Sequence, residues 1–117
     1  MNGDKETWRV TFTHRAGEDI LGIFAFIAER DGPDVAEAVL EKFIAARDGL
    51  RQLPDQGRIP PELARVNILS FREIQVQPYR IVYHVNKTTR EIYIHVVADG
   101  RRNFAEFLRE RLLEPRQ

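Results

Sequence analysis

The sequence predicts an α+β fold in which a hairpin of two helices packs on one face of a small, mainly antiparallel sheet. Apolar residues recur with a period of two at residues 8–12, and again in three consecutive runs between residues 71 and 97. This is the pattern of strands with one buried face. Between them, apolar residues recur at helical spacing over residues 14–30 and 33–52. The expected order is therefore β-α-α-β-β-β, followed by a short C-terminal helix.

The first strand is predicted to run directly into the first helix. Thr13 follows the strand and offers a side-chain oxygen to the free amides of a helix N-terminus. The helix should end near Arg30, before Asp31 and Gly32. Its apolar residues form a single stripe, made by Ala16, Ile20, Ile23, Phe24 and Ile27.

The second helix is predicted to begin at Pro33, since proline is well tolerated at the first helical turn. Leu53-Pro54 should end it, because proline does not continue a helix. The short connection through Asp31-Gly32 makes the two helices antiparallel neighbours. With one apolar stripe each, they should close together over one face of a sheet.

Residues 54–70 are predicted to form an irregular surface loop, because three prolines and one glycine interrupt any helix or central strand. One helical turn is expected around Glu62 to Arg65. We expect residues 1–117 to form a single domain, since domains of this length are the commonest. Residues 114–117 should fray.

The last three strands can be paired if Gln77-Pro78 is a two-residue turn, because Val76 then opposes Tyr79 and every second residue shares a face. One face is nearly all apolar and is expected beneath the helical hairpin: Ile74, Val76, Tyr79, Ile81, Tyr83, Val85, Ile92, Ile94 and Val96. The opposite face is mixed in polarity: Glu73, Gln75, Arg80, Val82, His84, Tyr93, His95 and Val97.

The C-terminal helix is predicted from about Arg102 to Leu113, with Pro115 ending it. Its apolar stripe contains Phe104, with Phe107 or Leu108 one turn later. The stripe either docks on the sheet or holds a partner, and docking is the favoured interpretation.

Composition narrows the class of protein. Charged residues make up 31% of the chain and no apolar run approaches the roughly 20 residues that cross a bilayer, so no membrane association is expected. Zero cysteines exclude disulfides, thiol catalysis and zinc–thiolate sites. This fits a reducing cytoplasm, where we expect the protein to act.

Charge is distributed unevenly although the net charge is zero. Residues 1–57 hold seven Lys/Arg against eleven Asp/Glu, and residues 58–117 hold eleven against seven, which gives −4 and +4. The sheet and the C-terminal end should therefore be more basic than the helical hairpin. The whole chain is far from the strongly basic profile of an autonomous nucleic-acid binder.

The element order and several segments resemble the RelE/ParE superfamily of bacterial type II toxin–antitoxin toxins. The resemblance covers most of the chain. It rests on the joint spacing of Ala16, Asp19, Ile20 and Ile27 in the first helix, Leu53 through Arg58 after the second, Tyr79 through Tyr83 in the third strand, and Val97 through Arg102 at the basic cap.

The resemblance implies one of two activities. RelE-type members enter the ribosomal A site and cleave messenger RNA, whereas ParE-type members poison DNA gyrase. It also implies a cognate antitoxin, ParD-like or similar, whose segment wraps the toxin. We expect that segment to fold on binding and to cover apolar surface of this chain.

Residues that differ from the nuclease members favour the ParE-like reading. RNA cleavage needs a base, cations for the phosphate charge and an acid. Gln75 stands where nuclease members usually carry Arg, and Glu73 lies two residues before it. No Tyr or His follows His95. We therefore predict no catalytic residues, and the resemblance to ParE-type members then implies DNA gyrase as the target. No cofactor and no metal are expected.

The mixed face and basic cap supply the candidate residues. Those expected to contact a partner are Arg80, Val82, His84, Tyr93, His95, Arg101, Arg102 and Phe104. In the alternative, a ribosome-dependent endoribonuclease acting on messenger RNA, the catalytic candidates are Arg80, Arg101, Arg102, His84 and His95.

Each candidate also has a structural interpretation. Three interpretations of His84 and His95 are open: an acid/base pair, two ligands of a metal that needs Glu73 as a third, or polar interface or half-exposed strand residues. We favour the last. Arg80 is expected to pair across strands with Glu73 or Gln75. Trp8 is either an interface anchor or a core aromatic, and the core is favoured.

Overall fold

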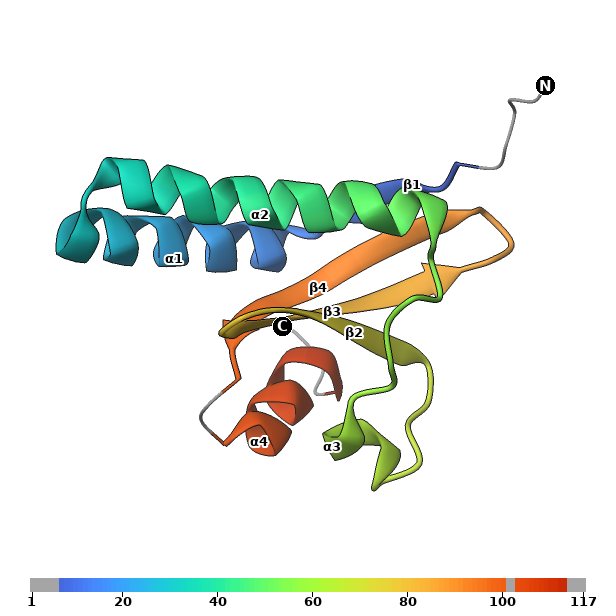
Figure 1. The fold of residues 1–117 in the computed structure, drawn as a ribbon. Coiled ribbons are helices and arrows are strands. Elements are labelled where there is room, and N and C mark those ends of the chain that lie inside the picture. The colour runs from blue at the N-terminus through green and yellow to red at the C-terminus, as the bar shows by residue number, and fades with distance from the viewer. Residues whose placement is uncertain (1–6, 101–102, 114–117) are drawn as a thin grey trace.

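The elements of the computed structural model, which describes residues 7–100 and 103–113, follow the predicted order (Figure 1). The basic cap at Arg101 and Arg102 and the expected frayed end at 114–117 lie outside the described residues. The elements are β1 (Arg9–Phe12), α1 (His14–Asp31), α2 (Pro33–Gln52), α3 (Pro61–Ala64), β2 (Phe71–Val76), β3 (Tyr79–Asn86), β4 (Glu91–Asp99), α4 (Phe104–Leu108) and a π-helical turn, η1 (Arg109–Leu113).

The strands form one sheet in the order β1-β4-β3-β2, in which β1 runs parallel to β4 and the other neighbours are antiparallel. The predicted pairing of the third and second strands is confirmed, since Val76 opposes Tyr79 and Ile74 opposes Ile81. The predicted α+β fold, with a helical hairpin on a mainly antiparallel sheet, is therefore confirmed.

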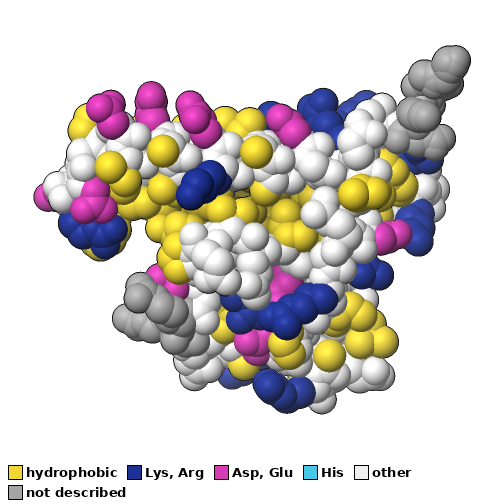
Figure 2. All heavy atoms as spheres, viewed as in Figure 1, with side chains coloured by type: hydrophobic (Ala, Val, Ile, Leu, Met, Phe, Trp, Pro, Cys, Tyr) yellow, Lys and Arg dark blue, Asp and Glu magenta, His cyan; other side chains and the backbone are white. Residues whose placement is uncertain are grey.

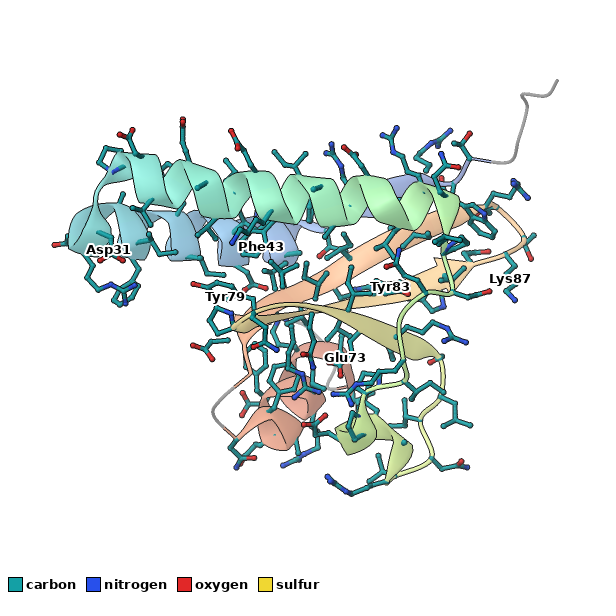
Figure 3. The ribbon with its side chains drawn as sticks, viewed as in Figure 1. Asp31, Phe43, Glu73, Tyr79, Tyr83 and Lys87 are labelled. Atoms are coloured by element: carbon teal, nitrogen blue, oxygen red, sulfur yellow. The ribbon has the colours of Figure 1, made fainter. Side chains whose placement is uncertain are left out.

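The helical hairpin covers one face of the sheet (Figure 1). The Thr13 hydroxyl accepts a hydrogen bond from the Ala16 amide at 3.2 Å, which caps α1 as expected. Gly32 joins the helices at a φ of 102°, a conformation that glycine adopts without steric cost. Phe43 on α2 packs edge-on against Tyr79, with ring centroids 5.3 Å apart, between the hairpin and the sheet (Figure 3).

A bulge in β4 makes one predicted face assignment wrong. Val82 pairs with Val96, but the next residue, Tyr83, pairs with Ile94, so His95 is the extra residue. A bulge of this kind shifts the alternation of side chains beyond it. Val97 therefore packs in the core beneath the hairpin and Val96 in the core on the opposite face, the reverse of the expectation.

The opposite face, which the alternation predicted to be mixed in polarity, is covered by the short helices. Figure 1 shows α3 and α4 on the far side of the sheet from the hairpin. A second core lies between them and the sheet, and α4 docks there as favoured. Its buried residues are Leu63, Val82, Val96, Phe104 and Leu108.

The segment between α2 and β2 is attached to the sheet at several points. Tyr83 Oη donates a hydrogen bond to the Pro54 carbonyl at 2.9 Å and accepts one from the Gly57 amide at 3.0 Å. Arg58 exchanges both backbone hydrogen bonds with Glu73. The helical turn expected near Glu62 is present as α3. These contacts place α3 and its side chains over the sheet.

No helix among the described residues has the length and apolar character needed to cross a membrane.

Candidate functional site

Arg80 is the centre of an ion-pair network on the sheet face that α3 and α4 cover. It reaches Glu73 on β2 at 2.7 and 3.0 Å, and Glu62 on α3 at 2.7 and 2.8 Å. Its guanidinium carbon lies 3.9 Å from the centroid of the Phe104 ring on α4. The predicted pair with Glu73 is thereby confirmed, and the same side chain links three elements.

The charges of this network are mutually satisfied. The hydrogen bond that Arg80 donates holds the pKa of Glu62 below its ordinary value. Burial works to lower the pKa of Arg80, but the bonds to Glu62 and Glu73 outweigh it and raise that pKa. Glu73 is 1% exposed and also accepts a hydrogen bond from Arg58 at 2.7 Å. Arg80 is therefore already occupied by two carboxylates.

The two candidate histidines lie together on the same face, as their strand positions predicted. Their ring centroids are 6.5 Å apart, and the Phe71 ring lies 6.0 Å from His84 and 5.7 Å from His95. Burial, and then the nearby His84 and Arg111, lower the pKa of His95. No group of three possible metal ligands occurs in the described part of the chain, and Glu73 is bound to arginines.

The lowered pKa of His95 predicts a pH effect on stability. At pH values between 6.5, the ordinary histidine pKa, and the lowered pKa of His95 in the folded state, the unfolded chain binds more protons than the folded chain does. The free energy of unfolding should therefore fall as the pH drops below 6.5, while remaining flat just above it. His95→Gln should flatten this decline in urea midpoints measured from pH 7.5 to 5.5. His14→Gln is the control: the His14 side chain is 87% exposed, so this variant should lose stability at low pH as the wild type does. If His95→Gln also lost stability like the wild type, His95 would not be the group responsible.

Asp19 and Arg111 form an ion pair, called the clamp below, that bonds to backbone groups at the outer edge of β4 where β1 ends. Beyond Phe12, no strand among the residues that the structure describes pairs with β4 on that side, so its backbone needs other partners. Asp19 accepts the Val97 amide at 3.0 Å, and Arg111 donates to the His95 carbonyl at 2.7 Å. Arg111 also donates two hydrogen bonds to Asp19, at 3.0 and 3.1 Å.

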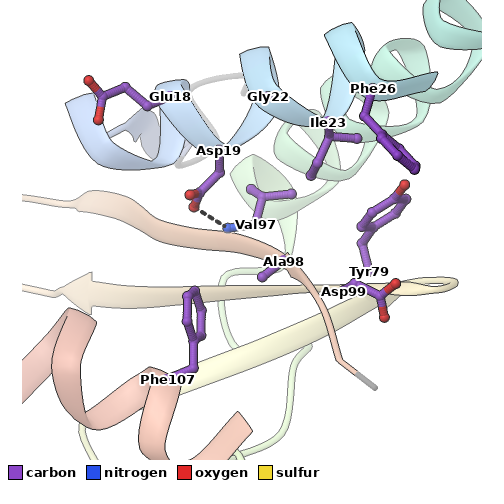
Figure 4. Close-up of a pocket in the computed structure, with 10 residues that line it drawn as sticks. All are labelled: Glu18, Asp19, Gly22, Ile23, Phe26, Tyr79, Val97, Ala98, Asp99 and Phe107. Carbon is purple, nitrogen blue, oxygen red and sulfur yellow. Dashed lines mark hydrogen bonds between the residues drawn. The ribbon is translucent and has the colours of Figure 1, made fainter. Parts of the chain in front are cut away.

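Next to this clamp lies a groove of about 800 Å³ between α1, the end of β4 and α4 (Figure 4). Its lining is mainly apolar, and Phe26 on α1 is 59% exposed. Figure 4 shows Ile23 and Phe26 facing Tyr79 across the groove. Glu18 and Asp99 also line it. The groove is thus an apolar surface with acidic residues around it.

The remaining candidates fall into three groups. Arg101 and Arg102 lie outside the described residues. Val82 and Phe104, which were expected to contact a partner, are 0% and 4% exposed because α4 docks on the sheet, so neither side chain reaches the surface of this structure. Tyr93 is partly buried and its hydroxyl is hydrogen-bonded to Glu91.

Trp8 is partly buried and packs against the core beneath the hairpin, as favoured.

Sequence reasoning missed several residues that the fold brings together. Glu62 and Arg58 are in a segment without periodicity, so no pattern placed them near Arg80. Arg111 lies 92 positions after Asp19. Phe26 falls outside the apolar stripe of the first helix. An aromatic residue on the side of the helix away from that stripe is the sequence signal that could have marked it.

Comparisons with known proteins identify one family by its sequence model and several solved structures with a similar fold. The model of the ParE toxin of the type II toxin–antitoxin system parDE matches residues 10–104. A chromosomal ParDE system from P. aeruginosa is similar in structure, with a TM-score of 0.65 and 18% identity over 81% of this chain and 98% of that one.

Two further solved structures are similar. The RelBE2 toxin–antitoxin complex from Mycobacterium tuberculosis has a TM-score of 0.55 and 20% identity, over 81% of this chain and 93% of that one. A mutant of the E. coli toxin RelE in the free state has a TM-score of 0.52 and 14% identity, over 86% and 92%. No curated protein matches by sequence. At these identities the solved structures support the fold, and the family model supports the family.

Proposed function

The chain belongs to the ParE family of type II toxin–antitoxin toxins, and from that premise we propose that it arrests growth by binding DNA gyrase in the cytoplasm. The proposal treats the toxin as a binding protein without chemistry of its own. It separates this chain from the RelE-type nucleases that share its fold.

The state of Arg80 is the observation that carries the proposal. A cation that stabilises a cleaving phosphodiester must be able to reach the phosphate oxygens. The Arg80 side chain is 11% exposed and makes four hydrogen bonds to Glu62 and Glu73. Neither α4 nor η1 carries a Tyr or a His, the residues that nuclease members often have in their final helix. This supports a site used for structure instead of catalysis.

Two assays on purified toxin test the proposal together. We expect supercoiling by gyrase to stop and gyrase-dependent DNA breaks to accumulate, while relaxation by a type I topoisomerase continues. We expect no codon-dependent cuts when messages are translated in vitro and mapped by primer extension. Normal supercoiling at saturating toxin would argue against gyrase as the target.

The alternative is a ribosome-dependent endoribonuclease, which the adjacency of His84 and His95 favours. Cuts in translated messages that disappear in His84→Gln/His95→Gln would establish this alternative. Arg101 and Arg102 would then be the next cations to replace.

We further propose that the cognate antitoxin occupies the groove beside α1. Exposed apolar side chains gathered in one groove, such as Phe26 and its neighbours here, mark candidate protein interaction sites. Glu18 and Asp99 would favour a segment that carries basic residues next to its apolar ones. Phe26 is exposed and is the large aromatic side chain at the C-terminal end of the α1 wall, so it is the expected anchor.

Phe26→Asp should weaken antitoxin binding by at least about 30-fold, because an interface anchor contributes about 2 kcal/mol or more. Isothermal titration calorimetry with the neighbouring gene product measures it. Leu21→Asp is the matched control, since Leu21 is also on α1, is 70% exposed and does not line the groove. Equal affinity in the two variants would place the antitoxin elsewhere.

A further inference from the structure

A cleft of about 390 Å³ lies at the end of the molecule opposite the α1–α2 turn. It is formed where β1 begins, α2 ends and the β3–β4 turn closes (Figure 1). The backbone holds these three segments together: the Trp8 amide donates to the Arg51 carbonyl at 3.2 Å, and the Arg9 amide to the Arg90 carbonyl at 3.1 Å. The lining residues are Thr7, Trp8, Arg9, Arg51, Thr89 and Arg90.

Arg90 occupies a backbone conformation that its residue type disfavours. Its φ is +60°, and the other described non-glycine residue with positive φ is Asn67, a type that tolerates this region. Glycine or asparagine would relieve the strain at the end of this turn. Residues held in such conformations cluster at functional sites. The Arg90 guanidinium carbon lies 4.9 Å from the centroid of the Trp8 ring, so the arginine side chain makes a cation–π contact that glycine would lack.

Positive charge exceeds negative charge around the cleft. Three arginines line it, and the neighbouring carboxylate, Glu91, is bound by Arg9 at 3.0 Å. Figure 2 shows Lys and Arg side chains gathered over this end of the molecule. Guanidinium groups match the geometry of phosphate oxygens, and threonine hydroxyls donate to phosphates as well.

We propose that this cleft binds the phosphodiester backbone of nucleic acid, with Arg51 and Arg90 contacting phosphates. In moving to a phosphate, Arg90 would leave the face of the Trp8 ring over which it lies, and an adjacent base would take its place. Tryptophan faces stack on bases without sequence preference, which an acidic peptide would not exploit. The proposal goes beyond gyrase binding and needs no other protein. Because the chain is neutral overall, the contact is local, weak and strongly salt-dependent.

Trp8 makes the test direct, because it is the single tryptophan of the chain. Its fluorescence should change on titration of the full-length toxin with a 12-nucleotide single strand or duplex at low salt. Arg51→Ala/Arg90→Ala should weaken DNA binding at least tenfold. It should also reduce the slope of log affinity against log salt by about 1–2, as expected for the loss of two phosphate contacts.

Two further variants separate binding from folding. Arg30→Ala is the matched control: Arg30 lies at the other end of the hairpin, and its guanidinium also lies 4.9 Å from an aromatic centroid, that of Phe26. It should bind DNA like the wild type. Arg90→Gly relieves the left-handed backbone, so it should unfold at higher urea while still binding DNA less tightly.

Three outcomes would overturn the proposal. The first is that the double variant binds DNA as tightly as Arg30→Ala does. The other two are that Trp8 fluorescence changes with a glutamate-rich peptide but not with DNA, or with inorganic phosphate but not with DNA. The titration contains no gyrase, so the two proposals are tested independently. The DNA-binding proposal stands if gyrase is not inhibited, and gyrase inhibition stands if the toxin does not bind DNA.

Discussion

Replacing Arg80 with alanine should lower the free energy of unfolding by about 3 kcal/mol, because it removes one partner of a buried ion pair. The Glu73 side chain is fully buried and, of its arginine partners among the described residues, would keep Arg58. Glu62 would lose both hydrogen bonds that attach α3 to the sheet. The Phe104 ring would also lose the guanidinium that lies over it, which weakens the docking of α4.

Urea unfolding followed by circular dichroism measures this effect. Arg30→Ala is a close control, since Arg30 also pairs with a carboxylate, Asp31, and stacks on a phenylalanine, but at the surface. Exposed pairs contribute about 0–1 kcal/mol, so the control should change little. If the two variants lose the same stability, the network is not the structural centre inferred here.

Replacing Asp19 with alanine should cost a similar amount, about 3 kcal/mol. The Arg111 side chain is 8% exposed and would be left as a buried charge without its carboxylate. The Val97 amide would lose its acceptor at the edge where β1 ends. The π-helical turn should detach first, because Arg111 connects it to α1 and β4.

Hydrogen exchange locates this loss. Asp19→Ala should raise exchange at Val97 and across η1 more than in β2. Glu18→Ala removes the neighbouring carboxylate, which is 62% exposed and pairs with His14, and should leave those amides protected. Uniformly faster exchange across the whole sheet in Asp19→Ala would instead indicate global destabilisation without a local clamp.

The local signals in the sequence predicted the elements well, because each depends on near neighbours. Thr13 caps the first helix, Pro33 begins the second, and Gln77-Pro78 turns β2 into β3 with the expected register. The prediction failed at His95, where one extra residue exchanged the faces of Val96 and Val97. Alternation alone does not reveal a bulge, since both valines suit either core.

The sequence by itself therefore determined the order of elements and the hairpin over the sheet, since periodicity and turn chemistry act over a few residues. Its resemblance to known toxins indicated the family. Only the tertiary structure decided which charges meet: Arg80 with Glu62, Asp19 with Arg111, and the arginines around Trp8. Those pairs join segments up to 92 positions apart. Their partners are selected by packing and by unpaired strand edges, which no local pattern records.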